Sequence, residues 1–194
     1  MKIVLASSNK HKVQEINDIV KSLGLSLEFI LPPDNFDPEE NGKTFEENSY
    51  IKALEAWKHA KTWVLADDSG LCIDSLGGRP GIYSARYAET PALRIQRVLK
   101  EMEGVKNRNA HFTCAMTLIN PNGEIAFKTE GICEGTIIEE SRGTNGFGYD
   151  PIFLVKGDKR TMAELSEDDK NRVSHRSVAL RNVLDFLKKS VLIS

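Results

Sequence analysis

Residues 65–71 form the stretch Leu65-Ala66-Asp67-Asp68-Ser69-Gly70-Leu71, in which two adjacent carboxylates follow a short apolar run. The apolar residues 63–66 predict a buried strand, and Ser69-Gly70 predicts that the backbone turns where the carboxylates emerge. Open α/β sheets bind ligands beyond the carboxyl ends of their strands. Two neighbouring carboxylates repel each other and favour a bound cation, and their hard oxygen ligands suit Mg²⁺. An Asx-type turn, in which an aspartate accepts hydrogen bonds from the following N–H groups, is the alternative interpretation.

The overall composition is that of a soluble globular protein. The chain has 194 residues, of which 40% are hydrophobic and 28% charged, enough for one large domain or two small lobes. Its formal net charge of −2 gives no general attraction to nucleic acid or to membranes. Its three cysteines lack C-x-x-C spacing, which argues against a disulfide framework or a zinc site. With neither a signal-peptide pattern nor a membrane-length apolar run, we expect a cytoplasmic protein that binds neither nucleic acid nor membrane.

A second polar turn, Ser7-Ser8-Asn9-Lys10-His11-Lys12, joins an expected strand at 3–6 to an expected helix. The apolar positions of that helix recur at helical spacing: Val13, Ile16, Val20 and Leu23. Lysines are disfavoured in a first helical turn because the helix dipole already places partial positive charge there. Backbone N–H groups, hydroxyl groups and ammonium groups at one helix start form an anion site, with a solvated N-cap as the alternative. Neither the Walker motif nor G-x-G-x-x-G occurs in the chain.

An acidic loop at 34–42 supplies a further candidate carboxylate, Glu40. It lies between a predicted strand at 27–31 and the pattern Thr44-Phe45-Glu46-Glu47, which is typical of a capping box that opens a helix. The acids of the loop therefore precede a helix N-terminus, within reach of the strand that carries Asp68. A solvated surface loop is the default interpretation of such a run of charges.

The second half of the chain changes from β/α alternation to antiparallel pairing. Thr90-Pro91 predicts a helix start, and Gly104 ends that helix. Two β-rich runs, 112–119 and 124–133, flank Asn120-Pro121-Asn122-Gly123, which is a strong hairpin signal. We therefore expect an α/β fold with an elongated mixed β-sheet flanked by helices.

Two more segments carry candidate binding residues. Residues 143–151 place three glycines around two aromatic side chains, which suggests exposed backbone and rings near a flat ligand, with a structural turn as the alternative. Ser166 opens a short acidic helix, and Ser174-His175-Arg176 precedes the final helix. A serine at that position is usually a helix cap. The glycine-rich loop 77–81 either approaches a ligand or merely turns the chain.

Taken together, these segments resemble the inosine triphosphate pyrophosphatases, also called noncanonical purine nucleoside triphosphate (XTP/dITP) pyrophosphatases. The motifs stand in the family's order and span nearly the whole chain. They are Ser7-Ser8-Asn9-Lys10-His11-Lys12, Thr44-Phe45-Glu46-Glu47-Asn48, Ala66-Asp67-Asp68-Ser69-Gly70-Leu71, Gly77-Gly78-Arg79-Pro80-Gly81-Ile82-Tyr83-Ser84-Ala85-Arg86, Phe147-Gly148-Tyr149-Asp150-Pro151 and Ser174-His175-Arg176.

The resemblance implies hydrolysis of ITP, dITP and XTP to the nucleoside monophosphate and pyrophosphate, which cleanses the nucleotide pool. It implies a Mg²⁺-dependent enzyme that forms a homodimer and whose partner is a small-molecule nucleoside triphosphate. It also implies a single domain over residues 1–194, with two lobes and a central nucleotide cleft.

The resemblance also implies roles for individual residues. Asp68 would accept a proton and, with Glu40, bind the metal, while Asp67 would support the site. Ser69 would contact the substrate. The phosphates would be held by Ser7, Ser8, Asn9, Lys10, His11 and Lys12, with Lys12 as the main charge. The base pocket would be lined by Phe147, Gly148, Tyr149, Asp150, Lys170, His175 and Arg176.

One residue departs from the expected pattern, and two other classes of function stay open. Asn145 stands where we expect glycine, and asparagine tolerates left-handed backbone better than other residues with a side chain. A related pyrophosphatase of modified pyrimidine nucleotides, as in the septum-inhibitor family, is one alternative. A catalytically silent nucleotide-binding module is the other. An aspartate-nucleophile phosphatase is disfavoured because the D-x-D spacing is absent.

Overall fold

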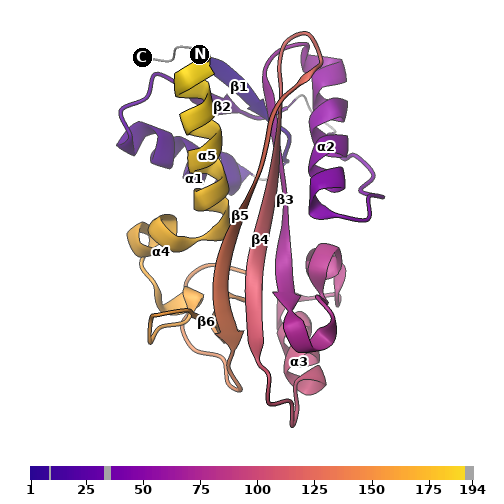
Figure 1. Ribbon diagram of the computed structural model, residues 1–194, viewed down its shortest axis with the longest axis vertical. Helices are drawn as coiled ribbons and strands as arrows, with labels where there is room; N and C mark the ends of the chain where they lie inside the picture. Colours follow the sequence, from indigo (N-terminus) through magenta and orange to yellow (C-terminus); the bar gives the residue numbers. More distant parts are fainter. Residues whose placement is uncertain (9, 33–35, 191–194) are drawn as a thin grey trace. The chain divides into compact units, whose positions relative to one another are not determined.

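The computed structural model describes residues 1–8, 10–32 and 36–190, without the side chains of Lys10, His11 and Glu15. Within this part of the chain, six strands form one sheet in the order β2-β1-β3-β4-β5-β6 (Figure 1). The strands are β1 (Lys2–Leu5), β2 (Glu28–Ile30), β3 (Val64–Ile73), β4 (Asn109–Ile119), β5 (Ile125–Ile137) and β6 (Phe153–Val155). The α-helices are α1 (Lys10–Ser22), α2 (Phe45–Ala60), α3 (Pro91–Glu101), α4 (Glu167–Val173) and α5 (His175–Ser190).

The sheet is mixed, as expected. Strand β1 pairs in parallel with β2 and with β3, and its last partner on β3 is Leu65. Strands β4 and β5 are joined at the predicted turn, where the backbone N–H of Asn120 donates to the carbonyl oxygen of Glu124. Strand β6 pairs antiparallel with β5. The prediction of an α/β fold with a mixed sheet and flanking helices is confirmed.

The prediction that the chain turns after Asp68 is wrong. Strand β3 is ten residues long and continues through Asp68, Ser69 and Gly70 to Ile73. The strands on either side of β3 explain this. Strand β1 has only four residues, but β4, on the other side of β3, has eleven, so β3 can continue its hydrogen bonding with β4 beyond the end of β1. Asp67 and Asp68 still lie just beyond Leu65, where the parallel ladder with β1 ends.

The helix starts follow from local capping. The hydroxyl oxygen of Thr44 accepts a hydrogen bond from the N–H of Glu47, as predicted, and the carboxylate of Glu47 accepts one from Lys43. Thr90 and Ser166 cap α3 and α4 in the same way. Such caps satisfy backbone donors that the first helical turn leaves without a partner.

The chain divides into two compact units. Unit 1 consists of Met1–Asp68, Cys114–Glu130 and Ala179–Ser194, and unit 2 of Ser69–Thr113 and Gly131–Val178. The expected cleft between two lobes stays a prediction. In the part of the chain that the structure describes, no helix is both long and apolar enough to span a membrane.

In unit 1 both faces of the sheet are buried under helices (Figure 1). Alternate residues of a strand point to opposite faces. Ile3, Leu5 and Leu65 accordingly pack with apolar residues of α1 and α5, whereas Val4 and Ala66 pack against α2. The core of unit 2 gathers apolar residues of β3–β6 and α3, together with Tyr87 and Tyr149.

Candidate active site

Asp68 and Glu40 converge on one ammonium group in unit 1. The Nζ atom of Lys52 lies 2.9 Å from Oε1 of Glu40 and 3.4 Å from Oδ1 of Asp68. Asn48 donates a hydrogen bond of 3.0 Å from its Nδ2 atom to Oδ2 of Asp68. Asn48 and Lys52 are four residues apart on α2, so both side chains lie on one helix face. The structure thus brings together the two carboxylates that the sequence singled out.

Burial controls the protonation of this group. Burial raises the pKa of Asp68 above its usual range, while the Lys52 charge and the Asn48 hydrogen bond oppose this. Burial lowers the pKa of Lys52, but the charges of Asp68, Asp67 and Glu40 outweigh it and leave the pKa raised. Lys52 therefore stays charged, and Asp68 is a better proton acceptor than an ordinary carboxylate.

The donor set around Asp68 fits a hard cation only in part. Mg²⁺ is usually held by one or two protein carboxylates, with water and substrate phosphates completing its shell. Asp68 and Glu40 supply two such carboxylates, and both are close enough together to contact the single ammonium group of Lys52. Among the described residues, no group of three or more acidic, histidine or cysteine side chains could hold a metal ion. The site therefore suits a Mg²⁺ that arrives with a phosphate ligand.

The neighbouring Asp67 belongs to a different pair. Its Oδ1 atom lies 2.6 Å from the Nζ atom of Lys12, in the first turn of α1, and its side chain is only 1% exposed. Adjacent residues of a strand point to opposite faces, so Asp67 faces α1, like Leu65, and Asp68 faces α2, like Ala66. Strand geometry is therefore in keeping with the unequal roles expected of the two residues, Asp68 as a metal ligand and Asp67 as a support, and those roles stay predictions.

The turn before α1 is described only in part. Ser7 follows β1, and its N–H donates to the carbonyl oxygen of Leu5 over 2.7 Å. Ser8 is exposed, and Ser69 is half-buried in β3. The predicted phosphate contacts of Asn9, and of the side chains of Lys10 and His11, lie outside the described residues. The roles predicted for this turn and for Ser69 stay predictions.

The second centre lies in unit 2 around Asp150, which is 4% exposed. Its Oδ2 atom accepts hydrogen bonds from the N–H of Phe147 at 3.0 Å and from Nζ of Lys170 at 2.7 Å. Phe147 is 60% exposed, and Nζ of Lys170 and Cζ of Arg176 lie over its ring, 4.8 Å and 5.6 Å from the ring centroid. This arrangement presents an exposed aromatic ring with two cationic groups over it.

Two residues predicted for this centre face the core of unit 2 instead of the exposed ring. The hydroxyl of Tyr149 donates to the carbonyl oxygen of Ser84 at 2.9 Å, and burial raises the pKa of Tyr149. The His175 ring stacks on Phe112, with ring centroids 4.9 Å apart. Gly148 has a positive φ of 63°, in the turn between Phe147 and Tyr149. Direct base contacts of these residues stay predictions.

Asn145 does not need the left-handed backbone that the sequence pattern suggested. Among the described residues, Lys61 is the sole one with a side chain and a positive φ. The N–H and side-chain amide of Asn145 donate to the carbonyl oxygens of Ala163 and Leu165, each at 3.0 Å. The asparagine thus ties its loop to the segment before α4.

Sequence reasoning missed Asn48 as a partner of Asp68 and missed Lys52 altogether. The available signal was their spacing. Asn48 and Lys52 are polar residues four positions apart, so they share the helix face that also carries the small buried residues Ser49 and Ala56. Ser84, whose hydroxyl accepts a hydrogen bond from the N–H of Leu71, was also missed. Its burial inside a glycine-rich motif has no sequence signal.

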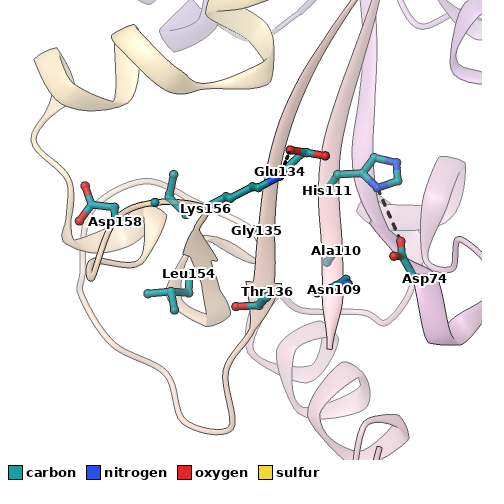
Figure 2. Close-up of a pocket in the computed structure, with 12 residues that line it drawn as sticks. Asp74, Asn109, Ala110, His111, Glu134, Gly135, Thr136, Leu154, Lys156 and Asp158 are labelled. Carbon is teal, nitrogen blue, oxygen red and sulfur yellow. Dashed lines mark hydrogen bonds and ion pairs between the residues drawn. The ribbon is translucent and has the colours of Figure 1, made fainter. Parts of the chain in front are cut away.

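A cavity of about 450 Å³ lies elsewhere in unit 2, between β4, β5 and β6 (Figure 2). An exposed ion pair of Lys156 with Glu134, at 2.7 Å, borders it, and Nδ1 of His111 lies 3.9 Å from Oδ1 of Asp74. Exposed pairs of this kind contribute little binding or stability. The cavity contains none of the predicted site residues, so we do not assign the site to it.

Comparisons with known proteins agree with the motifs. A sequence model of the Ham1 family matches residues 3–186. The chain is 45% identical to a dITP/XTP pyrophosphatase of Bacillus licheniformis, over 97% of this chain and 98% of that protein. It is 43% identical to one from Prochlorococcus marinus, over 96% of each. A solved HAM1 protein from Coxiella burnetii superposes with a TM-score of 0.89 at 42% identity, over 98% of this chain and all of the other.

Proposed function

The chain belongs to the Ham1 family, and we propose that it is a nucleoside triphosphate pyrophosphatase that hydrolyses dITP, XTP and ITP. The products are the nucleoside monophosphate and pyrophosphate. The observation that carries the proposal is the half-buried Asp68, with its raised pKa, held beside Glu40 and Lys52. A binding module without catalysis has no need of such a proton acceptor.

The proposed chemistry relies on positioning and on charge neutralisation, as phosphoryl transfer generally does. Asp68 accepts the proton of the attacking water. Lys12 and the turn at 7–12 hold the triphosphate. When bound at Asp68 and Glu40, Mg²⁺ supplies neutralisation of the phosphate charge.

The purine base is assigned to the second centre. The exposed ring of Phe147 stacks on the base, a contact worth about 1–3 kcal/mol. Lys170 and Arg176 flank that ring as donors. A donor from Arg176 suits the 6-oxo group of hypoxanthine and xanthine. Adenine presents an amino group there, and each unsatisfied donor costs about 1–3 kcal/mol.

We also propose the wider setting that the family suggests: one catalytic domain over residues 1–194, a homodimer, a cytoplasmic location and a role in cleansing the nucleotide pool. The family match over residues 3–186 supports the single domain. Sedimentation of the purified chain tests the dimer.

A substrate panel tests the activity. The chain is incubated with dITP, XTP, ITP, dATP, dGTP and dUTP, with Mg²⁺ or with EDTA, and pyrophosphate is measured. We expect release from the first three with Mg²⁺, little from dATP and dUTP, and none in EDTA; because guanine also carries a 6-oxo group, the rate on dGTP shows whether the 2-position takes part in selection. Asp68→Asn should be inactive, and the control Asp18→Asn, an exposed residue of α1, should match the wild type. A preference for dUTP, equal rates on dATP, or binding without turnover would each refute the proposal.

A further inference from the structure

The ion pair of Asp67 with Lys12 has no part in the chemistry described so far. The two charged atoms are 2.6 Å apart, and the side chain of Asp67 is 1% exposed against 19% for Lys12. The second oxygen of Asp67, Oδ2, lies 4.0 Å from the buried Sγ atom of Cys114, a weak donor. The carboxylate of Asp67 is therefore buried within unit 1, in contact with Lys12 and Cys114.

The position of Lys12 is unfavourable without such a partner. Lys12 is the third residue of α1, where the helix dipole repels a cation. Its four-carbon side chain also has many rotamers, so binding a ligand would cost conformational entropy unless the side chain were already fixed. A carboxylate on a strand in the sheet interior removes both problems, because it offsets the dipole and holds the ammonium group in one place.

We infer that Asp67 is a positioning residue that holds the ammonium group of Lys12 at the start of α1, ready for the triphosphate. The inference rests on the proposed function in one respect, the binding of phosphate by Lys12. An ammonium group carries three N–H donors, so it can bind Asp67 and a phosphate oxygen together. Asp67 acts through Lys12 and binds neither metal nor substrate.

The alternative role for Asp67 is that of a metal ligand beside Asp68. The strand geometry opposes it, because Asp67 points to the face of α1 and Asp68 to the face of α2. The partners agree with this division: Asp67 contacts Lys12 of α1, whereas Asp68 contacts Asn48 and Lys52 of α2.

Binding of inorganic tripolyphosphate in EDTA tests the inference without metal and without turnover. Calorimetry compares the wild type, Asp67→Asn, Lys12→Met and the double variant, with Asp18→Asn as a control of equal charge change on α1. We expect each single variant to bind about tenfold more weakly, as for loss of one charged hydrogen bond. The double variant should bind no more weakly than Lys12→Met alone. The inference would be overturned if Asp67→Asn bound tripolyphosphate with wild-type affinity, or if the fold-losses in affinity of the two single variants multiplied in the double variant.

A second variant covers the case in which Asp67→Asn does not fold. Asp67→Glu retains the buried charge but displaces it by one methylene, so we expect weaker tripolyphosphate binding from a folded chain. Unchanged affinity in that variant would refute a positioning role.

The dependence of activity on Mg²⁺ separates positioning from metal ligation. Asp67→Asn should raise the KM for dITP while leaving the half-saturating Mg²⁺ concentration unchanged, whereas Glu40→Gln should raise that concentration. An equal rise in Asp67→Asn would make Asp67 a metal ligand. If no variant, nor the wild type, hydrolyses dITP, the proposed function fails while the tripolyphosphate result still decides the role of Asp67.

Discussion

The hydroxyl group of Tyr149 donates a hydrogen bond to the backbone carbonyl oxygen of Ser84, over 2.9 Å and across 65 positions of sequence. The hydroxyl of Ser84 in turn accepts from the N–H of Leu71 and donates to the carbonyl oxygen of Gly81. Three segments therefore meet at Ser84: strand β3, the glycine-rich motif at 77–86 and the loop that carries Phe147. This junction explains why a buried tyrosine stands within a loop otherwise suited to ligand binding.

Removal of the Tyr149 hydroxyl should loosen this junction. We expect Tyr149→Phe to lower the free energy of unfolding by about 1 kcal/mol, since the carbonyl of Ser84 loses a buried donor. The KM for dITP should rise because the Phe147 loop is less fixed. Urea unfolding and steady-state kinetics measure the two effects. Tyr83→Phe, at a position 54% exposed, is the matched control, and equal effects of both variants would contradict the account.

The raised pKa of Asp68 predicts a specific pH dependence of stability in the metal-free chain. The folded state binds the Asp68 proton more tightly than the unfolded state, so the contribution of Asp68 to stability falls as the pH rises through its raised pKa. The window begins near the ordinary value of 3.8 and extends above it. Urea unfolding between about pH 4 and pH 7 should show Asp68→Asn gaining stability relative to the wild type as the pH rises. A constant difference would contradict the shift.

Lys52 should be needed to keep Asp68 ionised. Lys52→Met removes the charge that opposes burial, so the pKa of Asp68 should rise further in the metal-free chain. Carbon-13 NMR titration of the Asp68 carboxyl group measures it. Turnover of dITP should fall about 100-fold, as for loss of a preorganised charged group. Lys58→Met, at an exposed position of the same helix, should change neither quantity, and an unshifted pKa in Lys52→Met would refute the role.

Gly146 and Gly148 provide a matched pair in the loop around Phe147. Both have positive φ, 74° and 63°, so alanine at either position carries a backbone cost of about 1–2 kcal/mol. Only at Gly146 would the added Cβ also collide, at 2.1 Å from Oδ2 of Asp150. Gly146→Ala should therefore lose clearly more unfolding free energy than Gly148→Ala. Equal losses in urea unfolding would show that Asp150 is not fixed where the structure places it.

Local patterns predicted most of the elements, because caps and turns depend on neighbouring residues. Thr44, Thr90 and Ser166 cap the helices that the sequence suggested, and Asn120 begins the expected turn. The strand through Asp68 was misjudged because its length depends on β4, a partner distant in sequence. A Ser-Gly pair after two aspartates favours a turn only where no neighbouring strand continues to hydrogen-bond with that segment.

The candidate site was predictable in its residue types but not in its pairing. The motifs pointed to Asp68 and Glu40, whereas the ammonium group between them, from Lys52, is set by the approach of α2 to β3. Strand alternation sends the side chains of Asp67 and Asp68 to opposite faces of the sheet, which is in keeping with the unequal roles that the family motifs implied for them. Tyr149 matched a family motif, and only packing shows that its hydroxyl faces Ser84.

The position of bond cleavage decides whether the chain is a nucleoside triphosphate pyrophosphatase. Wild-type chain is incubated with dITP and Mg²⁺, and the phosphorus products are followed by ³¹P NMR. We expect dIMP and pyrophosphate in equal amounts, with no orthophosphate while dITP remains. Formation of dIDP with orthophosphate would contradict it, because cleavage would then lie between the β and γ phosphates.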